Sequence, residues 1–174
     1  MRLITAVEPV KFKEGDISVF LAGGITDCPE WQCQVIEGLQ DAGEDVVVLN
    51  PRRRDFPIHA ASEQITWEYH ALNCADIFSI WFSSGPSVQP ICMYELGRHL
   101  AKRSRNSIRE ALNTDGLLAI EKIAIGIEPG YLREQDVRVQ TSLVSPILSR
   151  RITDSLTAHI AEILSIVDRI RAGR

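Results

Sequence analysis

The chain has 174 residues, of which 45% are hydrophobic and 24% are charged, a balance typical of one globular domain with a sizeable core. Its formal net charge is −4 and no long run of one sign occurs, so it lacks the basic surface of a protein that binds nucleic-acid polymers. Residues 1–16 contain no apolar segment of the length that an export signal or a membrane anchor needs, and we therefore expect a cytoplasmic protein with no membrane partner.

The first part of the chain predicts one strand and one helix. Residues 1–16 mix charged and apolar side chains and are expected to form an extension ahead of the fold. Residues 17–22 are a short apolar run that ends at Gly23 and Gly24, which is typical of a strand buried on both faces. A helix is expected next, with Pro29 in its first turn.

The middle of the chain repeats this order. Residues 45–50 predict a second buried strand, and the polar residues 52–60 predict a loop over one edge of the sheet. Residues 62–75 have the apolar spacing of a helix, and residues 76–82 predict a third strand. A turn-rich stretch and a helix over residues 91–103 follow.

The last third of the chain begins with a weak pattern. Residues 104–121 are longer than a usual connection, so they are expected to be an insertion that forms an interface element or a lid. Residues 122–127 predict a fourth strand and residues 137–142 predict a fifth. The apolar stripe from Ile152 to Ile170 predicts a closing helix.

Alternating strands and helices indicate a fold class. They predict an α/β protein with a flavodoxin/Rossmann-like three-layer sandwich, in which about five mostly parallel strands have helices on both faces. We expect residues 1–174 to form a single domain of this kind. Ligands of such folds bind beyond the carboxyl ends of the strands, so the stretches 23–28, 50–56 and 83–95 are the places to look for a site.

Several segments carry a family resemblance. They are FLAGGI at 20–25, NPRR at 50–53, ALNCADIFSIWF at 71–82, YELGRHLA at 94–101 and GIEPGYLREQDVRVQ at 126–140. In order and spacing the chain resembles the nucleoside 2-deoxyribosyltransferase-like family over roughly residues 17–142. The resemblance implies a nucleoside or nucleotide as the small-molecule partner and no cofactor. It also implies a homo-oligomer, dimeric or larger, in which a neighbouring chain completes each site.

Two glutamates stand at the positions of the family's catalytic carboxylates. Glu95 matches the residue that these transferases use as the nucleophile on the anomeric carbon, as in retaining glycosidases. Glu68 stands where family members place an aspartate that protonates or orients the leaving base. Gly97 is expected to keep the helix slim beside Glu95. For each glutamate the alternative is a solvated acid on a helix.

Further residues are expected to contact the sugar. The resemblance implies that the turn at Gly23 and Gly24 lies against the sugar. Phe20 stands where many members have a tyrosine whose hydroxyl touches the nucleophile, so Tyr94 or Tyr69 is a candidate to replace that hydroxyl.

Other residues are candidates to contact a phosphate or the base. Gln89 stands where nucleotide-specific relatives carry a phosphate-binding serine and nucleoside-specific ones an aspartate, and it matches neither type. Ser84 could contact a 5′-phosphate, and Arg52 could hold one through bidentate contacts or remain an ion-paired loop residue. Asn50 ends the second predicted strand, two residues before Arg52, and is a further candidate to contact the substrate. Trp67 could stack on a base or belong to the core.

The remaining polar candidates are assigned no chemistry. The histidines lack metal-ligand spacing and the four cysteines show no CxxC pair, so no metal site is expected and the thiols are taken as reduced. Asp76, at the start of a buried strand, is expected to accept hydrogen bonds in a structural role.

Three classes of function remain open at this point. The first is cleavage or transfer at the N-glycosidic bond of a nucleoside, with a nucleoside 5′-monophosphate N-glycosidase as its close alternative. The second is a non-catalytic nucleotide-binding or sensing module, against which both acidic positions, Glu68 and Glu95, argue. The third is a flavodoxin-like regulatory domain, for which Lys122 is badly placed at the start of a strand.

Overall fold

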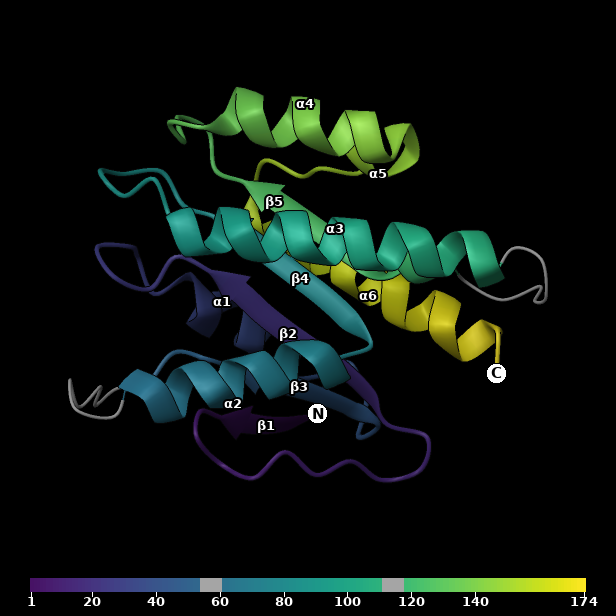
Figure 1. Ribbon diagram of the computed structural model, residues 1–174. Coiled ribbons are helices and arrows are strands. Elements are labelled where there is room, and N and C mark those ends of the chain that lie inside the picture. The colour runs from purple at the N-terminus through teal and green to yellow at the C-terminus, as the bar shows by residue number, and fades with distance from the viewer. Residues whose placement is uncertain (54–60, 111–117) are drawn as a thin grey trace.

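The computed structural model of the chain describes residues 1–53, 61–110 and 118–174, and for residues 109 and 110 only the backbone (Figure 1). Its centre is a single sheet of five strands, all parallel, in the order β1-β3-β2-β4-β5. The strands are β1 (Arg2–Thr5), β2 (Ile17–Gly23), β3 (Val46–Asn50), β4 (Ile77–Phe82) and β5 (Ile123–Ile127). The α/β class expected from the sequence is therefore confirmed.

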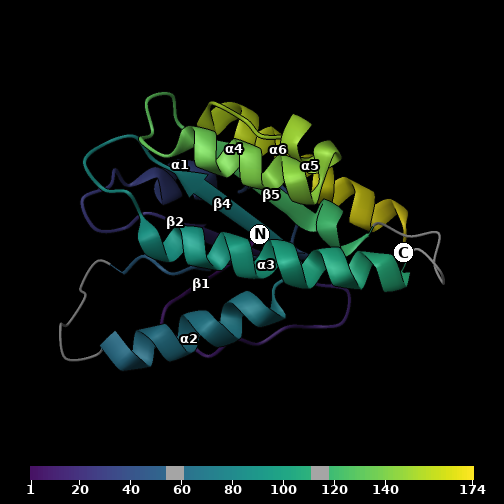
Figure 2. The same cartoon turned by 45° about the horizontal axis from the view of Figure 1, so that its top comes forward.

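Helices cover both faces of this sheet and make three layers. One face is packed against α2, α3, α4 and α5, and these lie side by side in both views (Figures 1 and 2). The other face is packed against α1 and α6. The helices are α1 (Trp31–Gly38), α2 (Ala61–Cys74), α3 (Pro90–Glu110), α4 (Glu134–Val144), α5 (Pro146–Arg150) and α6 (Leu156–Ala172), with a 3-10 turn η2 at Ala119–Lys122.

Apolar residues cover both faces of the sheet. Every residue of β3, β4 and β5 is buried, as a parallel sheet with two covered faces requires. In β2 the side chains alternate: Phe20 joins the core under α2 and α3, whereas Val19 and Leu21 join the core under α1 and α6. The strand that leads to the candidate site is thus held from both faces.

The prediction of a strand at residues 137–142 is wrong, because these residues belong to the helix α4. Val137 and Thr141 are buried, while Val139 between them is 49% exposed. Burial that recurs after four residues is helical, and Glu134 and Asp136 in the first turn favour a helix start through the dipole.

The fifth strand is β1, which comes from the segment expected as an extension. Arg2 to Thr5 pair in parallel with Val47 to Asn50 at the edge of the sheet. A strand of four residues gives too short a pattern for its period to be read in the sequence.

The segment expected as an insertion, 104–121, begins inside α3, which continues to Glu110. It ends in the 3-10 turn, where the Ile120 amide donates to Ser107 Oγ at 2.8 Å. The central part of the insertion, 111–117, lies outside the described residues, as do positions 54–60 of the predicted polar loop.

The order of the strands marks where a ligand site is expected. The neighbouring strands β2 and β4 send their following helices, α1 and α3, to opposite faces of the sheet. Such a switch point opens a crevice at the carboxyl ends of the strands.

Candidate active site

A cavity of about 690 Å³ lies at the carboxyl end of β2, between α2 and the start of α3. The strand and its turn supply Phe20, Gly23 and Gly24. Each of the two helices supplies one carboxylate, Glu68 from α2 and Glu95 from α3. The rest of the described lining is largely apolar, with residues such as Ile25, Ile65, Leu72, Ile91 and Cys92.

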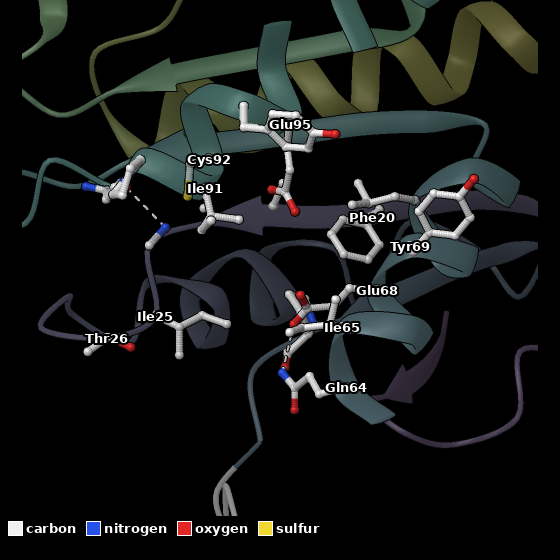
Figure 3. Close-up of a pocket in the computed structure, with 18 of the residues that line it drawn as sticks. Phe20, Ile25, Thr26, Gln64, Ile65, Glu68, Tyr69, Ile91, Cys92 and Glu95 are labelled. Carbon is white, nitrogen blue, oxygen red and sulfur yellow. Dashed lines mark hydrogen bonds between the residues drawn. The ribbon is translucent and has the colours of Figure 1, made fainter. Parts of the chain in front are cut away.

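Glu95 reaches the cavity from the second turn of α3. Figure 3 shows its carboxyl group pointing toward Glu68, which comes from the opposite wall. Burial, and then the negative charge of Glu68, raise the pKa of Glu95 to about 7, while Arg98 acts in the other direction. No described side chain makes a hydrogen bond to the Glu95 carboxylate, so its oxygens are open to the cavity.

Glu68 differs from Glu95 in having a fixed partner. Its Oε1 accepts a hydrogen bond from Nε2 of Gln64, one turn earlier on α2, at 2.8 Å. Burial raises the pKa of Glu68, and the bond from Gln64 opposes this rise.

The glycine turn lines the cavity with bare backbone. Gly23 has φ +149°, and a Cβ there would lie 2.4 Å from the carbonyl oxygen of Trp81 and 2.5 Å from the Trp31 ring. A Cβ on Gly24 would lie 2.3 Å from Cys28 Sγ. The turn therefore has no room for a side chain at either position.

Gln89 joins this turn to the loop after β4. Its Oε1 accepts from the Gly24 amide at 3.1 Å and its Nε2 donates to the Ser83 carbonyl at 2.8 Å. Gln89 lines the cavity, yet it is only 4% exposed and its amide group is engaged by these two backbone partners.

Four of the predicted substrate-binding residues do not line the cavity: Asn50, Arg52, Trp67 and Ser84. Arg52 donates to four acceptors within residues 25–32, three of them backbone carbonyls, and so fixes the loop after β2. Asn50 accepts from the Arg52 amide at 3.0 Å. Trp67 packs against Phe20 and donates to the Glu8 carbonyl at 2.7 Å.

Ser84 and Asp76 make their hydrogen bonds outside the cavity. The Ser84 amide donates to Glu128 Oε2 at 2.7 Å. The carboxylate of Asp76 accepts from the amide and hydroxyl of Ser18 at 2.9 and 2.7 Å. The structural role expected for Asp76 is thus confirmed.

Comparison with known families now bears on this site. A family model described as nucleoside 2-deoxyribosyltransferase like matches residues 16–109, more than half of the chain. The chain belongs to this family. The match includes Glu68, Glu95 and the glycine turn, and it leaves β1 and residues after 109 outside. Comparison with curated proteins finds no match.

Phe20 stands at the position where the resemblance implies a tyrosine, and it offers no hydroxyl to the cavity. Phe20 lines the cavity and is 1% exposed. Tyr94 and Tyr69 also line it, but they lie at its mouth and are 67% and 51% exposed. Neither hydroxyl is hydrogen-bonded to Glu95 in the described residues, so burial and charge alone set the pKa of this family member's carboxylate.

Sequence reasoning missed several residues of the cavity, chiefly Gln64, Ile65, Ile91 and Arg98. Gln64 and Ile65 precede Glu68 by four and three residues on α2, and Arg98 follows Glu95 by three on α3. Helical spacing from the two glutamates is a signal that could have found them.

Arg98 is the one cation among the described lining residues. Its guanidinium lies 4.6 Å from the centre of the Tyr69 ring and donates to Asn73 Oδ1 at 3.3 Å. In the described part of the chain, no group of three His, Cys, Asp or Glu side chains could hold a metal ion, and no helix is long and apolar enough to cross a membrane.

Proposed function

We propose that this chain cleaves the N-glycosidic bond of a nucleoside, with Glu95 as the nucleophile and Glu68 as the general acid. The observation that supports this most strongly is the pair of carboxyl groups that face each other across a largely apolar cavity (Figure 3). Glycosidic cleavage needs one carboxylate to meet the positive charge on the sugar and one acid to protonate the leaving group.

The proposed first step forms one bond to C1′, breaks one bond from C1′ and transfers one proton. A carboxylate oxygen of Glu95 bonds to C1′ while the bond from C1′ to the base nitrogen breaks, and its electron pair leaves with the base. Glu68 gives its proton to the departing base. A glycosyl ester on Glu95 remains. Water or a second base then attacks C1′ and gives a proton to Glu68, while the bond from C1′ to Glu95 breaks and its electron pair returns to the Glu95 carboxylate.

The protonation states that this step needs favour each other. The negative charge of Glu68 raises the pKa of Glu95, so a proton on Glu68 makes Glu95 easier to ionise. Burial raises the pKa of Glu68 as well, yet the pKa of about 7 is the one that Glu95 has beside a charged Glu68, so a single proton on the pair lies first on Glu95. The proposed reaction starts when that proton lies on Glu68 and Glu95 is ionised.

The charges around the cavity favour a nucleoside over its 5′-monophosphate. The candidate phosphate contacts are already engaged, Arg52 by the loop after β2 and the Ser84 amide by the Glu128 carboxylate. Two carboxyl groups and one guanidinium line the described cavity, a balance that repels a dianion. The hydroxyls of Thr26 and Ser87, which also line it, suit a sugar.

We also propose a homo-oligomer, as the family resemblance implies. Large apolar side chains at the mouth of the cavity are exposed, at 64% for Ile65 and 66% for Ile91. A neighbouring chain over this mouth would bury them and exclude water. Analytical ultracentrifugation of the full chain should give a dimer or larger species, and a monomer at all concentrations would contradict this.

The test of the proposed reaction is release of free base. The full chain is incubated with deoxynucleosides, ribonucleosides and their 5′-monophosphates, with and without an acceptor base, beside the variants Glu95→Ala and Glu95→Gln. We expect nucleosides to release base faster than monophosphates, and both variants to lose activity by about a thousandfold or more.

A matched control keeps this test specific. Glu37→Gln makes the same chemical change at an exposed position of α1, on the other face of the sheet, and should leave the rate unchanged. The proposal is wrong if no substrate releases base, which a non-catalytic binding module would give, or if the Glu95 variants match wild type.

A further inference from the structure

Gln64 is the buried neighbour of the proposed acid. It lies on α2 one turn before Glu68, lines the same cavity and is only 4% exposed. Its Nε2 makes two hydrogen bonds, to Glu68 Oε1 at 2.8 Å and to the carbonyl oxygen of Pro51 at 2.7 Å (Figure 3).

The Pro51 carbonyl decides which way the Gln64 amide faces. A carbonyl oxygen only accepts hydrogen bonds, so at 2.7 Å the atom of Gln64 that meets it must be the NH₂ group. The reversed amide would bring Gln64 Oε1 against the Pro51 oxygen. In the observed orientation Gln64 Oε1 is buried and has no hydrogen-bond partner among the described residues.

A fixed amide leaves Glu68 a single place for its proton. Glu68 Oε1 faces an N–H group of Gln64, and an oxygen that carries a hydrogen toward a donor would place two hydrogens against each other. The other oxygen, Oε2, has no hydrogen-bond partner among the described residues.

We propose that Gln64 is a positioning residue that confines the acidic proton of Glu68 to Oε2, the oxygen left free for the leaving base. This inference rests on the proposed function for its catalytic meaning, and on the two hydrogen bonds for its geometry. Proton transfer from Oε2 to the base leaves a carboxylate whose Oε1 is already stabilised by the N–H of Gln64. The hydrogen bond therefore strengthens as the proton leaves.

The first test needs no substrate. The full chain is labelled with ¹³C at its glutamate carboxyl carbons, and the signal of Glu68 is assigned by its loss in Glu68→Gln. Titration of wild type and Gln64→Met is then compared. Methionine has a similar length and cannot donate, so the midpoint of Glu68 should rise by about one pH unit. An unchanged midpoint overturns the proposal.

A second measurement covers the case in which Gln64→Met does not fold. The infrared difference spectrum between wild type and Glu68→Gln at low pH isolates the carbonyl stretch of protonated Glu68. A stretch lowered by hydrogen bonding is expected, because Oε1 keeps the double bond and accepts from Gln64. The stretch of a carbonyl without a hydrogen bond would overturn the proposal.

Kinetics connect the positioning role to the reaction. Gln64→Met should lower kcat more than it changes KM, and the loss should be larger for bases that need protonation than for bases that leave as stable anions. In a Glu68→Gln background the same change should have no further effect. An equal loss in both backgrounds would show that Gln64 acts on structure alone.

The two proposals fail in different ways. If wild type cleaves no nucleoside, the proposed function fails, while the titration and the infrared band still decide whether Gln64 directs the proton of Glu68. If wild type cleaves nucleosides and the midpoint of Glu68 ignores Gln64, only the positioning role fails.

Discussion

Glu95 and Glu68 share one cavity, so the charge of each depends on the other. Burial and the negative charge of Glu68 together raise the pKa of Glu95 to about 7, and Arg98 limits the rise. A carboxyl group with a pKa of about 7 changes its charge near neutral pH. The charge of Glu95 is therefore sensitive to any charge that enters or leaves the cavity.

The coupling predicts the effect of Glu68→Gln on Glu95. Because the change removes a negative charge that raises the pKa of Glu95, the midpoint should fall below 7 while staying above the value of a free glutamate, since burial remains. ¹³C titration of the Glu95 carboxyl carbon measures it. Glu63→Gln, an exposed position on the same helix α2, is the control and should cause no shift.

The same pKa predicts the alkaline limb of the activity profile. The proposed reaction needs one proton on the pair of carboxyl groups, and Glu95 ionises at about 7 beside a charged Glu68, so kcat/KM of wild type should fall as pH rises through about 7. An Arg98→Gln variant should move this limb to higher pH, because Arg98 holds the pKa of Glu95 down. Nucleoside cleavage followed from pH 5 to pH 9 measures both. A limb that stays in place in Arg98→Gln would contradict the role of its charge.

At the scale of single residues, motif resemblance predicted the two glutamates and the glycine turn but not their partners. Glu68 and Glu95 both line the cavity, as expected. Arg52 and Trp67 do not, because carbonyl groups nearby in space satisfy their donors. Those carbonyls belong to other segments, and a sequence does not state which loops meet.

Among the elements, α3 carries Glu95, the proposed nucleophile, and an uncrowded glycine. A Cβ on Gly97 would meet nothing within 4 Å, so the expected close approach at this position finds no counterpart among the described residues. Gly23, in the turn after β2, is the opposite case, because a backbone carbonyl lies 2.4 Å from the position of its Cβ.

These two glycines predict opposite changes in stability. Gly97→Ala should raise the free energy of unfolding by about 0.5–1 kcal/mol, since alanine favours a helix and meets no clash. Gly23→Ala should lower it by more than about 2 kcal/mol through strain and the clash. Urea unfolding measures both. Loss of stability in Gly97→Ala would mean that a chain outside this structure packs there.

The inner face of α3 also buries a neutral histidine. His99 is 1% exposed and its ring stacks on Phe78, with the ring centres 4.5 Å apart. Neither of its nitrogens has a hydrogen-bond partner in the described part of the chain. Burial, with nearby Arg103, lowers its pKa to about 4. Between that pKa and the ordinary value of 6.5, the unfolded chain holds a proton on His99 that the folded chain does not.

His99→Leu should therefore stabilise the protein, and more at pH 5 than at pH 8. Wild type loses stability as pH falls from about 6.5 toward 4, because unfolding takes up the proton of His99. Leucine has no proton to take up and leaves no unpaired nitrogen. Urea midpoints at the two pH values measure the difference, and an equal gain at both would contradict the buried neutral ring.

The strands whose residues are almost all buried were predictable from the sequence, whereas the structure of the segment 137–142 was not. The runs of β2, β4 and β5 are mostly apolar and were placed to within one residue at each end. The segment 137–142 misled because two of its three β-branched residues, Val137 and Thr141, face the core on a helix rather than on a strand. Tertiary packing decides such cases.

On the scale of the whole molecule, sheet topology puts the site where it is. The chain crosses from β3 through α2 to β4 and then into α3 on the same face, which brings two helices with one acid each over the end of β2 (Figure 1). Alternation of elements in the sequence predicted the three layers. It did not predict that Arg2–Thr5 completes the sheet, because that pairing is with β3 and not with the next strand in sequence.

The central claim is that Glu95 forms a covalent bond to the sugar. The most direct measurement is mass spectrometry of the full chain after incubation with an arabinosyl nucleoside that carries fluorine at C2′, which slows formation and breakdown of a glycosyl ester through its oxocarbenium-like transition states. We predict a sugar adduct on the peptide that contains Glu95 in wild type, and no adduct in Glu95→Gln. An adduct on another residue, or release of base by Glu95→Gln at the wild-type rate, would contradict the claim.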